Sequence, residues 1–142
     1  MKNRISAWIV LGVITIVAGL GLALTNEVTK GPIQQQAVAA EEKAKQLVMP
    51  EAASFYELAL EDGSVLFEAR SATGETVGFV GKAESKGYGG PVEVITGVKP
   101  DGTITGINVG GASFAETPGL GSKARDAAFT AQFAGKKSPV RL

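Results

Sequence analysis

Residues 92–109 read VEVITGVKPDGTITGINV, and this stretch decides the fold that the sequence predicts. Apolar and polar side chains alternate from Val92 to Val98, which is typical of a strand with one buried face. Residues 99–102 follow as Lys-Pro-Asp-Gly, with proline and glycine where a tight turn favours them. Because residues 103–109 resume the strand pattern, the sequence predicts an antiparallel hairpin over 92–109.

Further strand patterns lie upstream of this hairpin. Residues 65–69 and 77–80 predict two strands that are joined by a turn at 70–75. The stretch SFYELAL at 54–60 is ambiguous, and the glycine-rich residues 86–91 predict a loop.

Downstream of the hairpin, glycines punctuate a predicted loop over 110–121. Ser122 is the expected N-cap of a helix over 123–133, and Gly135 is its expected C-cap. Residues 138–142 resemble the entry to another strand. The fold class is therefore predicted to be α+β, with an antiparallel sheet.

The N-terminal segment predicts a membrane anchor. Residues 7–24 read AWIVLGVITIVAGLGLAL without a charged side chain, and as a helix they would span about 27 Å, close to the thickness of a bilayer core. Lys2 and Arg4 precede the stretch and Glu27 follows it, which predicts a cytoplasmic N-terminus and an extracytoplasmic remainder. A cleaved signal peptide and a buried core helix are the alternatives.

A second helix is expected between the anchor and the sheet. Thr29-Lys30-Gly31-Pro32 predicts a break, and residues 33–48 are rich in helix formers before Pro50 ends them. The expected domains are 1–25 (cytoplasmic N-terminus and anchor), 26–50 (connecting helix) and 51–142 (sheet domain).

Composition excludes several kinds of chemistry. The chain has no Cys and no His, so it offers no thiolate for an iron–sulfur cluster and no imidazole for haem or general base catalysis. The 14 basic side chains equal the 14 acidic ones, so no broad basic surface indicates nucleic acid binding. No metal site or catalytic residue is predicted, and any redox function would need an organic cofactor or a partner.

Two glycine-rich segments are the candidate binding site. In ETPGLG at 116–121, the glycines permit positive φ or close approach to a ligand, and free N–H groups at the start of the next helix would bind an anion or a carbonyl oxygen. In GYGG at 87–90, Tyr88 offers a face for stacking or a phenol for hydrogen bonding. Each segment alone also fits an ordinary structural turn.

The order and spacing of the N-terminal helix, GYGG, the PDG hairpin and ETPGLG closely resemble the G subunit of the Rnf complex. The pattern is similar, more distantly, to the C subunit of the sodium-pumping NADH:quinone oxidoreductase, and both belong to the FMN-binding domain family. GYGG, in place of a Trp-containing loop, favours the Rnf family.

The resemblance implies an electron-transfer subunit of a redox-driven ion translocase that exchanges electrons between ferredoxin and NAD⁺, with no independent catalysis. It implies FMN on the outer side of the membrane, joined to a Thr by a phosphoester that a flavin transferase makes. It implies other Rnf subunits (integral membrane, flavin and iron–sulfur subunits) and membrane lipid as partners. The residues implied to line the isoalloxazine are Glu116, Thr117, Gly119, Leu120 and Gly121, with Tyr88, Gly89 and Gly90 as further candidates for the pocket wall.

The sequence departs from the family at two places. The attachment motif, roughly Asp-x-x-Ser-Gly-Ala-Thr-x-Thr, does not occur after residue 135, so the sheet domain is expected to be incomplete and the flavin-bearing Thr to lie beyond Leu142. Phe114 stands in a stretch where the family often has His before ETPG. Thr73 lies in a superficially similar segment, which we interpret as a turn between two strands. A cofactor-free, membrane-anchored docking subunit is the alternative function.

Overall fold

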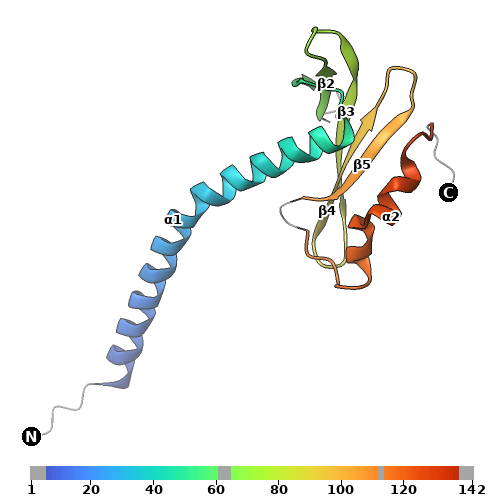
Figure 1. Cartoon of the computed structure of the whole chain (residues 1–142). Helices are drawn as coiled ribbons and strands as arrows, with labels where there is room; N and C mark the ends of the chain where they lie inside the picture. Colours follow the sequence, from blue (N-terminus) through green and yellow to red (C-terminus); the bar gives the residue numbers. More distant parts are fainter. Residues whose placement is uncertain (1–5, 61–64, 112–113, 138–142) are drawn as a thin grey trace, which may run out of the picture. The chain divides into compact units, whose positions relative to one another are not determined.

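The computed structural model describes residues 6–60, 65–111 and 114–137, and the chain divides into two compact units, residues 1–38 and 39–142. The first unit holds most of helix α1, which runs over Ala7–Val48 (Figure 1). The expected strand at 138–142 and the basic residues Lys2 and Arg4 lie outside the described residues.

Helix α1 has the length and composition of a membrane span. The most apolar window of the helix lies near the N-terminus and none of it is buried within the protein, which contradicts the alternative of a buried core helix. A signal sequence would pass the same test of length and composition.

The predicted break at residues 29–32 is wrong, because helix α1 continues through Pro32. A proline removes one N–H donor and crowds the carbonyl four residues before it, but it leaves the remaining backbone bonds of the helix intact. The Gln-, Ala-, Glu- and Lys-rich residues after Pro32 have high helix propensity and carry the helix to Val48. The anchor and the expected connecting helix are thus one continuous element.

The second unit contains a five-stranded antiparallel sheet in the order β1-β2-β3-β4-β5. The strands are β1 (Ser54–Ala59), β2 (Val65–Arg70), β3 (Thr76–Lys86), β4 (Pro91–Val98) and β5 (Ile104–Gly110) (Figure 1). The ambiguous stretch at 54–60 is therefore a strand, and the α+β fold class is confirmed.

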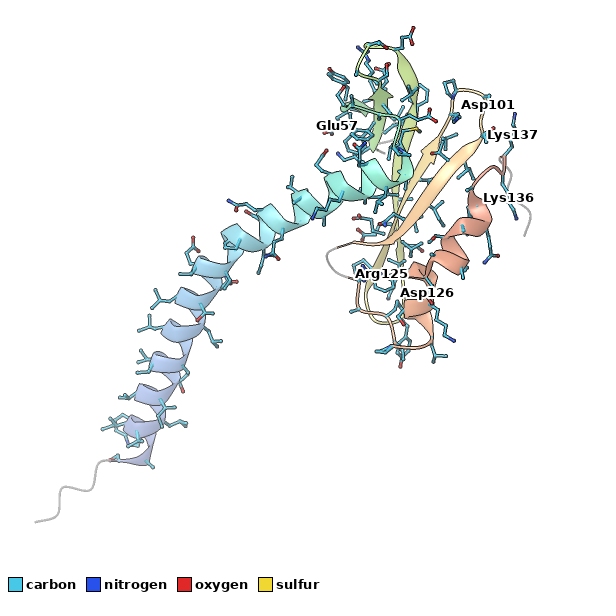
Figure 2. The ribbon with its side chains drawn as sticks, in the orientation of Figure 1. Glu57, Asp101, Arg125, Asp126, Lys136 and Lys137 are labelled. Carbon is cyan, nitrogen blue, oxygen red and sulfur yellow. The ribbon has the colours of Figure 1, made fainter. Side chains whose placement is uncertain are left out.

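The predicted hairpin over 92–109 is confirmed. Val94 pairs with Val109 and Val98 pairs with Ile104 across β4 and β5. In the turn, Gly102 has a φ of +83°, which glycine adopts without strain. The Asp101 carboxylate accepts hydrogen bonds from the N–H and hydroxyl of Thr103, and it pairs with Lys137 at 3.2 Å (Figure 2). These interactions lower the pKa of Asp101 to about 2.

The last turn of α1 and one face of the sheet form the core. Val48 and Met49 are almost fully buried together with Val80 and Ile95. The hydroxyl of Thr105 on β5 donates a hydrogen bond to the carbonyl of Val48, which fixes the end of the helix against the sheet.

A lysine is buried at the same junction. Lys45 is only 4% exposed, and its ammonium lies 2.6 Å from Glu42 and 3.9 Å from the ring centroid of Phe67. Its second carboxylate partner, Glu41, lies 3.5 Å away and also accepts a hydrogen bond from Lys82 on β3. Opposite charges and an aromatic face therefore stabilise this cation after it leaves water.

The ion pairs continue onto the sheet through Lys82, which lies 2.7 Å from Glu41 and 2.9 Å from Glu93 on β4. The hydrogen bond from Lys82 lowers the pKa of Glu41 and outweighs the opposing effect of burial. Burial disfavours the charged form of Lys82, but its bonds to Glu41 and Glu93 raise its pKa overall. The network thus links helix α1 to two strands.

We expect Lys45→Ala to destabilise residues 39–137 by about 2 kcal/mol, because it removes both the stacked ammonium and the buried methylenes of the stem. Lys45→Met keeps a long apolar stem on Phe67 and is expected to cost less than about 1 kcal/mol. Thermal unfolding of the full chain in detergent, followed by circular dichroism, measures both. An equal loss of unfolding free energy in the two variants would show that the methylene stem of Lys45 does not dominate its contribution.

The expected helix at 123–133 is wrong in its continuity. The segment consists of η1 (Gly121–Arg125), α2 (Ala127–Thr130) and η2 (Ala131–Phe133), with extended backbone at Asp126 (φ −66°, ψ 141°) between the first two. Ser122 is not the N-cap, because its hydroxyl accepts a hydrogen bond from the N–H of Gly119 instead. Ala134, with extended backbone, caps the last turn, and Gly135 (φ +79°) donates its N–H to the Ile104 carbonyl of β5, so Gly135 is not the expected C-cap.

Candidate functional site

The GYGG segment is the tip of the hairpin between β3 and β4. The Gly87 N–H donates a hydrogen bond of 2.8 Å to the Gly90 carbonyl, which closes the tip. Tyr88 projects from it with 94% of its surface exposed. The phenol ring thus has almost no contact with the rest of the described chain.

The ETPGLG segment is a tight bend between the end of β5 and η1. The N–H groups of Leu120 and Ser122 both donate to the Thr117 carbonyl, at 3.1 and 3.2 Å. Gly119 has a φ of +77°, which explains the glycine at that position. Leu120 lies at the apex and is 73% exposed, an unusual amount for a leucine beside a sheet domain.

These two segments meet at one place. The Gly89 N–H donates a hydrogen bond of 3.1 Å to Oε1 of Glu116, which is 27 residues away in the sequence. A Cβ added to Gly87 would collide with the same Oε1, and one added to Gly121 would lie 2.7 Å from Oε2. The structure therefore brings Gly87 and Gly89 of the first segment to Glu116 of the second, whereas Tyr88 and Leu120 are exposed and border different clefts.

Four of the N–H groups that were expected to be free around the bend have partners. Those of Gly119, Leu120, Ser122 and Lys123 donate to acceptors within residues 117–122. The element that follows is also a short 3₁₀ turn instead of a long α-helix. The prediction of an anion site at this helix start therefore cannot rest on these four groups.

Two shallow clefts border the joined loops. One, of about 470 Å³, is lined by Leu120, Gly121 and residues of η1 and α2, including Lys123 and Phe129. The other, of about 520 Å³, surrounds the hairpin tip at residues 84–91. Leu120 and Tyr88 each therefore lie at the edge of an open cleft.

Two contacts near this site were not predicted from the sequence. The glycines of GYGG are expected to allow close approach, and the structure shows that the group Gly87 approaches is the Glu116 carboxylate. Arg125 of η1 lies over the ring of Phe114 at 5.1 Å, so Phe114 packs against a cation. Neither contact can be read from a short stretch of sequence. Gly87 and Glu116 are far apart in the chain, and Phe114 and Arg125 lie on the two sides of the bend.

The arrangement offers stacking surfaces and hydrogen-bonding groups instead of acid–base or metal chemistry. Tyr88 and Leu120 supply exposed apolar surface, and Thr117 supplies a hydroxyl. Among the residues that the structure describes, no group of three or more Asp or Glu side chains is placed to hold a metal ion.

Comparison with known proteins gives a consistent match. The family model for the FMN-binding domain matches residues 87–140, a range that begins at the hairpin tip and includes the bend. The chain is 38% identical over 149 aligned positions to the G subunit of the Na⁺-translocating ferredoxin:NAD⁺ oxidoreductase complex of Acetobacterium woodii, covering 94% of this chain and 70% of the relative.

Two further relatives carry similar names. The G subunit of the proton-translocating ferredoxin:NAD⁺ oxidoreductase complex of Clostridium ljungdahlii is 30% identical over 128 residues, covering 90% of this chain and 66% of the relative. The G subunit of the ion-translocating oxidoreductase complex of Cereibacter sphaeroides is 35% identical over 125 residues, covering 81% of this chain and 55% of the relative.

Proposed function

Because this chain belongs to the family of G subunits of ion-translocating ferredoxin:NAD⁺ oxidoreductase complexes, the Rnf complexes, we propose that it carries electrons within such a complex as its FMN-binding subunit. The observation that supports this most directly is the joining of the two glycine-rich loops inside the range that matches the FMN-binding domain. We expect no independent catalysis by the chain itself.

The residues present fit a flavin. The two loops carry an exposed aromatic and an exposed aliphatic side chain, Tyr88 and Leu120, which are the kinds of surface that a planar ring covers. Bound FMN would supply one-electron chemistry, and the protein would supply position and polarity. The residues proposed to form the site are Glu116, Thr117, Gly119, Leu120 and Gly121, with Tyr88, Gly89 and Gly90 as further candidates for the same pocket wall.

Within this site each side chain has a limited task. Leu120 excludes water from one face of the ring, and Tyr88 stacks or donates a hydrogen bond. The Thr117 hydroxyl donates to or accepts from a polar ring edge. Lys123 lines the same cleft as Leu120, and its positive charge would balance negative charge on a reduced ring.

The covalent attachment is the finer part of the proposal. A flavin transferase would join the FMN phosphate to a Thr hydroxyl through a phosphoester. The proposed partners are the integral membrane, flavin and iron–sulfur subunits of the complex, together with lipid around residues 7–24. The proposed domains are 1–25, 26–50 and 51–142, with the N-terminus cytoplasmic and the FMN-binding domain on the outer side of the membrane.

We expect Leu120→Ala to weaken FMN binding to the purified chain in detergent by about tenfold, because the change removes most of the apolar surface at the bend. Titration of FMN, followed by quenching of its fluorescence, measures the affinity. Leu47→Ala is the matched control, because Leu47 is 72% exposed on α1 and lies outside the two loops. The FMN affinity of this variant is expected to equal that of the wild type.

The test of covalent attachment uses the complete reading frame, co-expressed with a flavin transferase. A yellow protein with fluorescence that survives denaturing electrophoresis is the expected result. A colourless product under the same conditions would contradict the flavoprotein function and favour a cofactor-free docking subunit.

A further inference from the structure

We propose that Glu116 is a positioning residue that clamps the β3–β4 hairpin tip onto the 117–121 bend, instead of a group that hydrogen-bonds the flavin directly. Only the identity of the ligand that the two loops bind depends on the proposed flavin function. The clamp itself is a property of the protein without any cofactor.

The first observation is the direction of the carboxylate. Glu116 is half-buried, and its Oε1 accepts the hydrogen bond from the Gly89 N–H at 3.1 Å. Its Oε2 lies on the side of Gly121, where an added Cβ would be only 2.7 Å away. Both oxygens therefore face the backbone of the two loops, and a charged acceptor makes the bond to Gly89 stronger than a neutral one would.

The second observation is that the backbones at Gly87 and Gly89 lie so close to Ala115 and Glu116 that neither position has room for a Cβ. A Cβ at Gly87 would collide with Oε1 of Glu116, and a Cβ at Gly89 would collide with the Ala115 carbonyl. Neither glycine has a φ in the left-handed region, so close approach explains them better than backbone freedom does. The hairpin tip therefore touches Ala115 and Glu116, the residues that lead into the bend, at Gly87 and Gly89.

The consequence concerns Tyr88 and Leu120. Both side chains are largely exposed, Tyr88 to 94% and Leu120 to 73%, so their positions depend mainly on the backbones that carry them. The bond between Gly89 and Glu116 lies next to Tyr88 on one loop and four residues before Leu120 on the other. Glu116 therefore fixes how the loop that carries Tyr88 lies against the loop that carries Leu120, and so where these two apolar side chains stand relative to each other.

The clamp is tested first without flavin, by hydrogen–deuterium exchange of the Gly89 amide in the full chain in detergent micelles. In Glu116→Ala this amide loses its acceptor, and its exchange is expected to quicken by about tenfold or more. Glu116→Gln keeps an acceptor oxygen at the same reach, so its exchange is expected to stay within about threefold of the wild type. Glu57→Gln on exposed β1 is the control (Figure 2).

The same clamp can be opened from the other loop. Gly89→Ala is expected to reproduce the fast exchange of residues 86–90, because its Cβ would collide with the Ala115 carbonyl. Gly81→Ala in the same hairpin is the matched control, since its Cβ would meet only Leu66 at 3.8 Å. Unchanged exchange of the residue 89 amide in both Glu116→Ala and Gly89→Ala would overturn the clamp, whatever the chain binds.

The flavin-loaded protein separates positioning from direct contact. If Glu116 positions the loops, Glu116→Gln retains the affinity for FMN within about threefold and leaves the reduction potential of the flavin unchanged, while Glu116→Ala weakens the affinity. An upward shift of the potential in Glu116→Gln, with normal exchange at Gly89, would show that the negative charge acts on the ring and would overturn the positioning role. A wild-type chain that binds no FMN but shows the expected exchange would contradict the proposed function and leave the clamp standing.

Discussion

Replacing Gly97 with alanine is expected to destabilise the sheet unit by about 3 kcal/mol and to lower its melting temperature by about 10 °C or more. Gly97 is buried on β4 beneath the end of α1, and a Cβ there would collide with the Val48 carbonyl and with the Thr105 hydroxyl. Because these two groups are hydrogen-bonded to each other, the methyl group would displace the helix end and break its bond to the sheet. Thermal unfolding of the full chain in detergent measures the loss.

The neighbouring glycine on β5 supplies the control. Gly106 pairs with Gly97 across the hairpin, and its Cβ would meet Val48 at an ordinary 3.6 Å. Gly106→Ala is therefore expected to change the stability by less than about 1 kcal/mol. Equal effects of the two substitutions would show that the helix end is not seated on Gly97 as described.

The second large effect concerns the membrane. The double substitution Ile14→Asp and Val17→Lys is expected to move the protein out of the membrane fraction, because each charge near the centre of a spanning helix costs about 3 kcal/mol. Together they oppose insertion by roughly four orders of magnitude. Both side chains are more than half exposed in the described structure, so the changes leave the sheet unit intact.

Matched charges placed further along the same helix test whether position matters. Ile33→Asp with Val38→Lys adds the same pair after the apolar stretch and is expected to leave the protein in membranes that resist carbonate extraction. The Ile14→Asp and Val17→Lys variant is expected to leave the membrane fraction. If it stays there, residues 7–24 are not a membrane anchor. A mature wild-type protein whose mass lacks residues 7–24 would instead identify the segment as a cleaved signal.

The sheet was largely predictable because its information is local. Turn chemistry at Lys99 to Gly102 and alternation on both sides define the hairpin over 92–109, and the structure has the same strands in that register. The stretch at 54–60 could not be assigned, since β1 is an edge strand whose outer residues Glu57 to Ala59 are all exposed. Burial alternation, the usual signal of a strand, is therefore absent there.

The errors arise where local preference and context disagree. The proline signal at Pro32 is overridden by strong helix formers on its C-terminal side. In contrast, the alanine-rich residues 123–133 favour a helix but are interrupted at Asp126, where the segment packs along β5. The helix propensity of a segment does not predict such a contact with a distant strand.

The candidate site shows the same limit. The two glycine-rich segments are identifiable from the sequence because glycine has few roles in such short motifs. Their common partner is not, because the bond between Gly89 and Glu116 joins a hairpin tip to a bend across 27 residues. Its geometry also reassigns Glu116 from an expected ring ligand to the proposed clamp.

The simple strand order has a consequence for how the polypeptide assembles. Each strand pairs with the next one along the chain, so the ladder can close step by step through short loops, a topology of low contact order that favours rapid folding. The contact between the end of α1 and the sheet is non-local, because the Val48 carbonyl accepts its hydrogen bond from Thr105, which is 57 residues later in the chain. During synthesis the ladder would thus form first, and the junction with the helix would lock only when the last strand has arrived.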